Sequence, residues 1–248
     1  MAQQHVDISC RNRVLNAFSA EDFEIVQPHL EKVPLKFRQR LQSENRAIKH
    51  VYFPESGLAS IVAIGGGERR QAEVAVVGHE GMTGLPIVLG VERSPCEVFV
   101  QVEGSAHCIT TEAMRGLMDN SLSILKVFLR YAHVYAVQAG FTALANARGN
   151  IPERLARWLL MARDRLDSDR MLLTHDYLAL MLGVRRAGVT GALQDFERRA
   201  LIATARGTVT ILNRRGLEEC ADGLYGAPEA EFERVFAKEP VRERPLLS

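Results

Sequence analysis

The residues with the most distinctive chemistry occupy one short stretch, residues 173–201. Two adjacent arginines are followed there by small or hydroxyl-bearing residues. The set is Arg185, Arg186, Gly188, Thr190 and Gly191. A guanidinium can donate two parallel hydrogen bonds to a phosphate or to a guanine edge, and short neighbours let a helix approach closely. The pattern therefore predicts a helix face that enters the major groove of DNA.

Two packed helices are needed to position this face. Thr174 stands where an N-cap is expected, with Asp176 in the first turn. Apolar residues then follow at helical spacing: Leu178, Ala179, Met181 and Leu182. Gly183 ends this helix in a sharp turn, because glycine adopts backbone conformations that other residues avoid. Val189 and Leu193 return a second helix to the same core, so the stretch predicts a helix-turn-helix.

The segment after the second helix, residues 201–213, alternates β-forming residues around Arg206-Gly207. This alternation predicts a small hairpin, or wing. A pair of packed surface helices with solvated arginines is the alternative, because any helical hairpin shows this apolar spacing. A helix-turn-helix followed by a wing is a rarer combination, and it favours DNA binding.

The same stretch resembles the Crp/Fnr superfamily of bacterial transcription regulators. The pattern T-x-x-x-L-A-x-x-L-G-V-x-R-x-x-V is carried by Thr174, Leu178, Ala179, Leu182, Gly183, Val184, Arg186 and Val189. The resemblance is specific over residues 173–212 and extends more loosely over the whole chain. It implies an α+β fold with an N-terminal double-stranded β-helix, or jelly roll, that senses a small molecule. A long dimerisation helix and a C-terminal winged helix-turn-helix would follow.

Two kinds of DNA contact are expected on this basis. Phosphate contacts are predicted for Thr174, His175, Arg185, Thr190 and Arg206. Arg186 matches the base-reading arginine of the family, and a bidentate pair with guanine gives roughly 1–3 kcal/mol of discrimination. Ala187 and Gly191 stand where the cyclic-AMP receptor has a base-reading glutamate and a second base-reading arginine. The target sequence is therefore expected to differ, with Ala187 a candidate contact for a thymine methyl group.

The composition indicates a folded, cytoplasmic protein. The chain has 248 residues, of which 47% are hydrophobic, enough for one large or two small domains. No apolar run reaches about 18 uncharged residues, and the start MAQQHVDISC lacks the apolar core of a signal peptide. We therefore expect no membrane partner.

The four cysteines, Cys10, Cys96, Cys108 and Cys220, are scattered without C-x-x-C spacing. This distribution disfavours a disulfide framework and a local zinc site. We expect inert thiols, no metal and no cofactor.

The net charge of +1 conceals an uneven distribution. Residues 151–216 contain twelve arginines and seven acidic residues, a net charge of +5, whereas residues 217–248 have four basic and eight acidic residues, a net charge of −4. Local positive charge supplied by arginine is typical of nucleic-acid binding, although solvated helix faces also carry it.

Residues 33–109 contain short β-forming runs broken by glycine, which predict a barrel or sandwich. The runs are HVYFP, GLASIVAIGGG, AEVAVVG, CEVFVQV and SAHCI. Cyclic-nucleotide-binding relatives use an acidic residue for the ribose and an Arg-Ser/Thr-Ala run for the phosphate. Here Leu85 replaces the acid after Gly84, and Pro95 replaces the alanine after Arg93-Ser94. A cyclic nucleotide is therefore not expected.

The sequence also lacks the features that mark the other effector sites of the family. Iron–sulfur members use clustered N-terminal cysteines, and this chain has only Cys10 there. His79, His107 and His133 are candidate haem ligands, but a lone histidine is more often solvated or hydrogen-bonded, and no ligand pair can be assigned. The effector stays unassigned.

Residues 121–147 predict a long helix. One side has the a/d spacing of a coiled-coil seam: Leu122, Leu125, Leu129, Ala132, Ala136, Ala139 and Ala143. A second side with Val127, Tyr131 and Val134 is also apolar, so the helix must be buried on more than one side. We expect the second side to cover the β domain and the seam to meet a symmetry-related copy. A helix inside one larger monomeric domain is the alternative.

Four segments are expected along the chain. They are a β-roll sensor-like domain (1–120), the long helix and hinge (121–149), the winged helix-turn-helix (150–224) and a charged tail (225–248). Residues 12–30 are expected to be helical, Gly149 is the hinge candidate, and further helices are expected over 152–166 and 214–224. The tail is expected to be mobile or to offer an additional partner surface.

Together these features predict a homodimeric transcription regulator that binds an inverted repeat in double-stranded DNA, with RNA polymerase as a candidate partner. A signal in the β domain would shift the population of conformations at the hinge. One alternative is a β-barrel sensor or scaffold that regulates a protein partner without binding DNA. A cupin-like enzyme is another, but His50, His79 and His107 form no His-x-His pattern, so no catalytic residue is expected.

Overall fold

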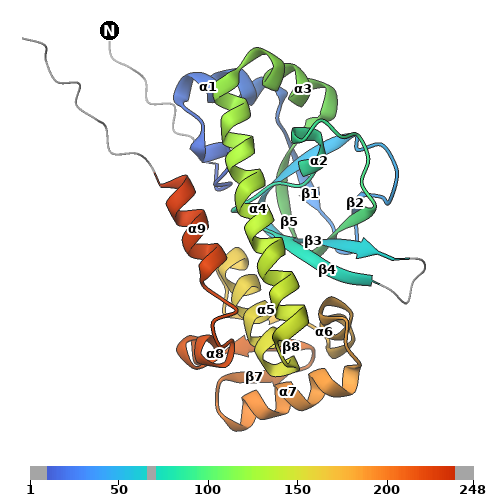
Figure 1. The fold of residues 1–248 in the computed structure, drawn as a ribbon, viewed down its shortest axis with the longest axis vertical. Coiled ribbons are helices and arrows are strands. Elements are labelled where there is room, and N and C mark those ends of the chain that lie inside the picture. Colours follow the sequence, from blue (N-terminus) through green and yellow to red (C-terminus); the bar gives the residue numbers. More distant parts are fainter. Residues whose placement is uncertain (1–9, 66–70, 238–248) are drawn as a thin grey trace, which may run out of the picture.

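The computed structural model describes residues 10–65 and 71–237 of the chain. A β domain and a helical C-terminal domain lie at opposite ends of the molecule, and helix α4 (Leu122–Arg148) runs alongside both (Figure 1). This arrangement confirms the predicted α+β class, with its long helix between a β domain and a helix-turn-helix.

The β domain is an antiparallel sheet with the strand order β1-β5-β3-β4, in which β2 also pairs with β5. Its strands are β1 (Glu31–Leu35), β2 (Arg40–Gln42), β3 (His50–Ile64), β4 (Gln71–Val77) and β5 (Cys96–Thr110). Because β3 and β5 pair along most of their length, they form the frame of the domain.

Two glycines that suggest strand ends in the sequence lie inside long strands. Gly57 joins HVYFP to the following run within β3, and Gly104 joins CEVFVQV to SAHCI within β5. A Cβ atom at Gly104 would lie 2.2 Å from the carbonyl oxygen of Ser56, and one at Gly57 would lie 2.5 Å from that of Val102. The register between the strands shifts here, so these glycines allow close backbone approach at a bend.

The N-terminal segment and α4 close one side of the β domain. The predicted helical region 12–30 contains η1 (Leu15–Ala17), α1 (Ala20–Val26) and η2 (Gln27–His29). Phe128 of α4 meets Phe18 edge to face, with centroids 5.5 Å apart, and stacks on Phe53 of β3 at 6.1 Å. Helices α2 (Leu85–Val88) and α3 (Thr111–Asn120) complete this domain. One face of α4 therefore covers the β domain, as predicted.

The expected hinge separates α4 from α5 (Ile151–Leu166). Gly149 ends α4, and Asn150 caps α5: the Asn150 side chain accepts a hydrogen bond from the Glu153 amide, and the Glu153 side chain accepts one from the Asn150 amide. This capping box fixes the start of α5 one residue before the predicted position.

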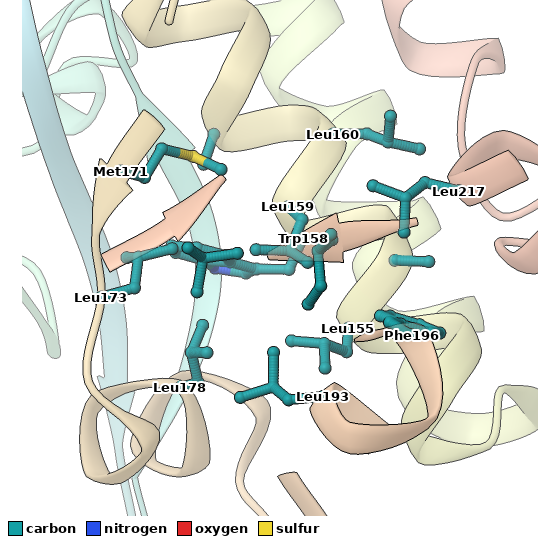
Figure 2. Close-up of a cluster of buried hydrophobic side chains, with 14 of the residues drawn as sticks. Leu155, Trp158, Leu159, Leu160, Met171, Leu173, Leu178, Leu193, Phe196 and Leu217 are labelled. Carbon is teal, nitrogen blue, oxygen red and sulfur yellow. The ribbon is translucent and has the colours of Figure 1, made fainter. Parts of the chain in front are cut away.

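The C-terminal domain is a winged helix-turn-helix. It contains β6 (Arg170–Leu172), α6 (His175–Leu182), α7 (Arg186–Arg198), β7 (Ile202–Ala205), β8 (Thr208–Ile211) and α8 (Arg214–Cys220). Figure 2 shows its core, where Trp158 and Leu159 of α5 meet Leu178, Leu193 and other apolar residues of the surrounding elements. The two predicted helices and the wing are therefore present, and the closing helix α8 is shorter than expected.

The expected tail contains a further helix, α9 (Ala227–Phe236), which packs against α4 (Figure 1). Phe232 is buried, and His133 of α4 lies 2.6 Å from a carboxylate oxygen of Glu231. The description of the tail as mobile is therefore wrong for this part, since Pro228 near the helix start and a repeating apolar spacing support a packed helix. Residues 238–248 lie outside the described part of the chain.

Among the described residues, none of the helices combines the length and the apolar character that crossing a membrane requires.

Candidate nucleic-acid interface

The turn between α6 and α7 has the geometry that its sequence predicts. The Thr174 hydroxyl accepts a hydrogen bond from the Tyr177 amide at 3.2 Å, which caps α6. Gly183 ends α6 in the left-handed region, with φ of 61° and ψ of 36°, and the chain then enters α7 at Arg186. Leucine or alanine at this glycine would be strained.

Helix α7 buries one face and exposes the other. Val189, Leu193 and Phe196 are buried in the domain core, whereas the side chains of Arg185 and Arg186 are exposed. Arg185 precedes the helix in an extended conformation without a side-chain cap, so the first amide groups of α7 keep no capping side chain. The exposed first turn therefore combines free backbone donors with two guanidinium groups.

Gly188 has a different role from the one its sequence position suggests. A Cβ atom at Gly188 would lie 2.6 Å from Cδ1 of Ile151, so this glycine lets α7 pack closely against the start of α5. Gly191, by contrast, faces open space. Of the two glycines, only Gly191 remains a candidate for close approach to DNA.

The wing turn fits the predicted two-residue hairpin. Arg206 and Gly207, between β7 and β8, have φ values of 48° and 76°. Positive φ at both central residues is typical of a type I′ turn, which suits the twist of a hairpin. The turn leaves the Arg206 side chain exposed at the tip of the wing.

A hollow of about 410 Å³ lies between the start of α6, the start of α7 and the wing. Thr174, His175, Arg186 and Arg206 all line it, although they come from three separate elements. The fold therefore brings four of the seven predicted DNA-binding residues to one concave surface. Arg185 and Ala187 are exposed beside it, on the N-terminal side of α7.

Two contacts within this surface could not be read from the sequence. His175 Nδ1 lies 2.9 Å from the Thr190 hydroxyl, so the predicted phosphate contact Thr190 is already held by its neighbour. Asp176 Oδ1 lies 3.3 Å from Arg186 Nε, and both side chains are largely exposed, at 73% and 65%. The predicted base-reading arginine is thus paired with a carboxylate from α6.

The predicted seam of α4 faces away from the buried side of the helix. Leu122, Leu129, Ala136 and Ala143 are exposed, and Leu125, Ala132 and Ala139 are half-buried. The opposite side contributes Ile124, Val127, Phe128, Tyr131 and Val134 to the core. The seam is therefore an apolar stripe that the described residues of this chain cover only in part.

The C-terminal domain docks on the β domain through a buried carboxylate. Glu73 of β4 accepts hydrogen bonds from Trp158 Nε1 of α5 at 2.6 Å, from Gln101 Nε2 at 2.9 Å and from the Ser60 hydroxyl. Burial raises the pKa of Glu73 to about 7, although the hydrogen bonds from Ser60 and Trp158 and the charge of Arg157 act in the opposite direction. The docked state therefore holds a carboxyl group that titrates near neutrality.

A second polar connection reinforces this docking. Arg165 near the end of α5 donates to Glu80 of the β domain at 2.7 Å, and its side chain is only 7% exposed. Leu58 and Val76 of the β domain also belong to the same hydrophobic cluster as the core of the C-terminal domain. The two domains consequently share one core across their boundary.

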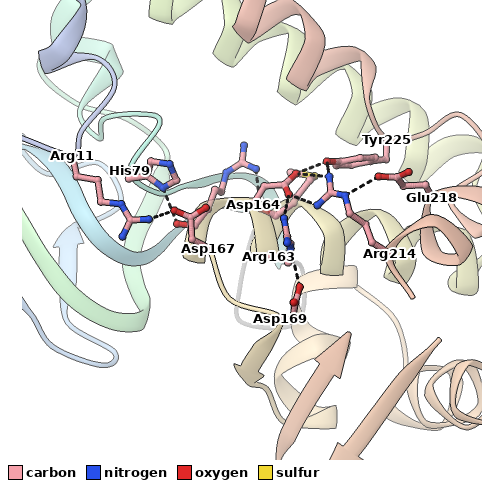
Figure 3. Close-up of polar contacts among 11 residues, drawn as sticks. Arg11, His79, Arg163, Asp164, Asp167, Asp169, Arg214, Glu218 and Tyr225 are labelled. Atoms are coloured by element: carbon pink, nitrogen blue, oxygen red, sulfur yellow. Dashed lines mark hydrogen bonds and ion pairs between the residues drawn. The ribbon is translucent and has the colours of Figure 1, made fainter. Parts of the chain in front are cut away.

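Polar contacts also tie α5 to its other neighbours (Figure 3). Asp164 accepts hydrogen bonds from Arg214 of α8 and from the Tyr225 hydroxyl, and Arg11 of the N-terminal segment pairs with Asp167 (Figure 3). Burial opposes ionisation of Asp164, but these hydrogen bonds lower its pKa overall. The C-terminal half of α5 is thus a junction between the domains.

A small, apolar hollow lies at the segment where cyclic-nucleotide-binding relatives have their phosphate cassette. Leu85 is buried at the start of α2, and the hollow that it lines with Ser94 and Tyr135 has a volume of about 140 Å³. Pockets for drug-sized ligands occupy about 300–1,000 Å³. Arg93 is exposed.

The fold also gathers three residues that sequence spacing keeps apart. Ligand atoms of Cys10, Glu55 and His107 all lie within 4.8 Å of one another. No local pattern predicts this cluster, because its members are dozens of residues apart: the pairing of β3 with β5 brings Glu55 near His107, and the N-terminal segment adds Cys10 through its hydrogen bond to Glu55.

Known proteins resemble the chain in domain content and in fold. Residues 153–220 match the model of the Crp-like helix-turn-helix domain. No curated protein sequence matched the chain significantly.

Three solved structures illustrate the similarity. FixK2 from Bradyrhizobium japonicum has a TM-score of 0.66 at 15% identity, over 77% of this chain and 96% of its own. TTHB099, a CRP-family transcriptional regulator from Thermus thermophilus, has a TM-score of 0.64 at 19% identity, over 77% and 96%. CLP, a c-di-GMP-responsive global regulator from Xanthomonas campestris, has a TM-score of 0.63 at 16% identity, over 78% and 99%.

These identities are low, so the solved structures establish the fold, and the helix-turn-helix match identifies the domain that carries the exposed arginines. The chain therefore has the fold seen in Crp/Fnr-family structures and carries a Crp-like helix-turn-helix domain over residues 153–220.

Proposed function

We propose that this protein is a sequence-specific transcription regulator that binds an inverted repeat in DNA as a homodimer. The observation that carries the proposal is the concave surface between α6, α7 and the wing. Two exposed arginines, Arg186 and Arg206, face it from separate elements, together with the capped start of α6 at Thr174. Cations and helix N-termini on one exposed surface suit the phosphates and base edges of a duplex.

The residues divide into two roles within this proposal. Arg186 reads a guanine, because it lies exposed on the first turn of α7 and its fork matches the O6 and N7 atoms of that base. Arg185, Arg206, Thr174 and His175 contact phosphates and set the register. Thr190 orients His175 through their hydrogen bond and takes a phosphate only as a secondary role.

The open seam of α4 supplies the twofold pairing in this proposal. A pair of chains joined through Ala132, Ala136 and Ala139 would place their helices close together, since these side chains are small. Two recognition helices would then meet half-sites about one helical turn, or 34–36 Å, apart. RNA polymerase is a candidate partner of the bound dimer.

Regulation would act on the docking between the domains. Gly149 separates α4 from α5, while Glu73 and Arg165 hold the C-terminal domain on the β domain. An effector that favours a different docking would shift the population competent for DNA binding. The small apolar hollow at Leu85 supports an effector other than a cyclic nucleotide.

Selection from a random pool of duplexes tests the DNA-binding proposal. The full-length protein is expected to enrich an inverted repeat and to bind it more weakly as salt rises, because bound arginines release counterions from the phosphates. Enrichment of no sequence, or of an unpaired half-site only, would contradict the proposal.

Sedimentation of a seam variant tests the pairing. Ala136→Glu places a charge on the exposed stripe and is expected to give a monomer at micromolar protein, while the small substitution Ala136→Ser keeps the dimer. A wild-type protein that sediments only as a monomer would refute the assignment of the seam.

A further inference from the structure

Cys10, Glu55 and His107 form a compact group at the junction of the N-terminal segment with β3 and β5. The Cys10 thiol donates to Glu55 Oε1 at 2.9 Å, and His107 Nε2 lies 3.6 Å from the same oxygen. Cys10 is only 9% exposed, and the Glu55 and His107 side chains are 12% and 24% exposed. A thiol, a carboxylate and an imidazole thus lie together in a largely buried position, where His107 is the most exposed of the three.

Neither ring nitrogen of His107 has a hydrogen-bond partner among the described residues. The 3.6 Å separation between Nε2 and Glu55 is longer than a hydrogen bond. Among the described residues, its other ring nitrogen, Nδ1, has no hydrogen-bond partner although it is shielded from solvent. A cation bound at Nε2 would therefore break no hydrogen bond of the ring among the described residues.

The separations suit a tetrahedral cation. Zinc bonds of about 2.3 Å to sulfur and about 2.0–2.1 Å to nitrogen or oxygen place ligand atoms about 3.3–3.6 Å apart. The distance between Nε2 and Oε1 already lies at this value, and the thiol would move by about half an ångström once it no longer donates to the carboxylate. All three ligand atoms lie within 4.8 Å of one another, so side-chain rotations can bring them to these separations.

We propose that Cys10, Glu55 and His107 bind a zinc-like divalent cation, with the fourth position open to solvent. A thiolate and a carboxylate balance the two charges of the ion, and a neutral imidazole completes the protein ligands. Binding displaces one proton, from the Cys10 thiol, because the thiolate is the ligand form. Calcium and magnesium are excluded by the sulfur and nitrogen donors, since both prefer oxygen.

The position of this site connects it to the rest of the molecule. The Arg11 and Asn12 amides donate to the Glu55 carboxylate at 2.8 and 3.1 Å, and the Arg11 guanidinium pairs with Asp167 after α5 (Figure 3). A cation at Cys10 would therefore fix the segment that contacts the C-terminal domain.

Titration of the reduced, chelator-treated full-length protein with cobalt(II) tests the site, because a cysteine ligand gives a sulfur-to-cobalt charge-transfer band. One equivalent of Co²⁺ is expected to produce this band, and Zn²⁺ is expected to remove it by displacement. Cys10→Ser is expected to abolish the band. His107→Gln is expected to weaken Zn²⁺ binding by more than about 100-fold, beyond what loss of an outer-sphere partner costs.

Two matched variants control for other thiols and imidazoles. Cys220→Ser on α8 and His50→Gln at the exposed start of β3 should leave both the band and the Zn²⁺ affinity unchanged. Circular dichroism checks that each variant is folded. If Cys10→Ser does not fold, the test rests on His107→Gln alone. A protein that gives no band with one equivalent of Co²⁺ would overturn the proposal. Zn²⁺ affinity unaffected by His107→Gln would also overturn it. None of these readouts depends on DNA.

Discussion

Two ion pairs of the C-terminal domain lie in opposite environments. Arg186 and Asp176 pair at the candidate nucleic-acid interface with side chains that are 65% and 73% exposed, whereas Arg165 and Glu80 pair at the docking end with 7% and 14% exposed. An exposed pair contributes about 0–1 kcal/mol and is readily exchanged for another partner, but breaking a buried pair leaves an uncompensated charge. One end of the domain can therefore exchange its ionic partner at little cost, whereas the other end holds its position.

The largest expected effect is at the docking end. Trp158→Ala removes a buried ring and the donor to Glu73, so the free energy of unfolding is expected to fall by about 3–5 kcal/mol in urea denaturation. Trp158→Phe keeps most of the ring and loses only the donor, and a fall of about 1–3 kcal/mol is expected. Equal stability of the wild type and both variants would show that the docking contact is not structural.

A pH-dependent effect of similar size is expected from Glu73. Its pKa lies near 7 in the folded protein against an ordinary value of 4.5, so between these values the folded state holds a proton that the unfolded state has lost. The free energy of unfolding should therefore be highest below about pH 4.5 and fall by about 3 kcal/mol as the pH rises through about 7. Denaturation curves of the wild type and Glu73→Gln across this range check it. The variant should lack this fall in the free energy of unfolding. If the free energies of unfolding of the two proteins differed by the same amount at every pH, Glu73 would not be the group that titrates.

A smaller effect is expected at the wing. Arg206→Asn keeps a residue that tolerates the positive φ of the turn and removes the cation. Affinity for specific and non-specific DNA should fall together, and the slope of log K against log salt should decrease by about 1 per subunit. A loss confined to one base position would instead assign Arg206 to base reading.

The smallest effect is expected from the exposed pair. Asp176→Asn releases Arg186 and removes a negative charge from the candidate nucleic-acid interface, so operator affinity is expected to rise by a few-fold, within the ~1 kcal/mol that such pairs contribute. Fluorescence anisotropy with a labelled operator measures it. Thermal unfolding should stay unchanged, and a weakened affinity would show that Asp176 positions Arg186 productively.

The two ends of the molecule also differ in how many of their contacts can be predicted from the sequence. At the candidate nucleic-acid interface, Thr174, Gly183 and Arg206-Gly207 follow local rules of capping and turn geometry, so their conformations follow from neighbouring residues. The pairing of Asp176 with Arg186 depends on the angle between α6 and α7, which no local pattern gives. Likewise, the packing role of Gly188 becomes visible only with Ile151 in place.

The sequence predicts that residues 33–109 form β-strands, but it does not predict the contacts that these strands make. Gly57 and Gly104 interrupt the alternating pattern, yet both lie within continuous strands because a bend requires residues without Cβ atoms. Glu73 resembles a solvent-facing strand residue until α5 brings Trp158 over it. The cluster of Cys10 with His107 arises in the same way, from long-range pairing.

Competition between operator and non-specific duplex tests whether Arg186 reads a base. Arg186→Ala is predicted to lower the preference for the selected operator by roughly 1–3 kcal/mol, mostly at one guanine of each half-site, while the protein stays folded. Arg215→Ala, an exposed arginine on α8 that is paired with Glu219, is the matched control and should leave the preference unchanged. An Arg186→Ala protein with the affinity and site preference of the wild type would show that Arg186 does not read a base.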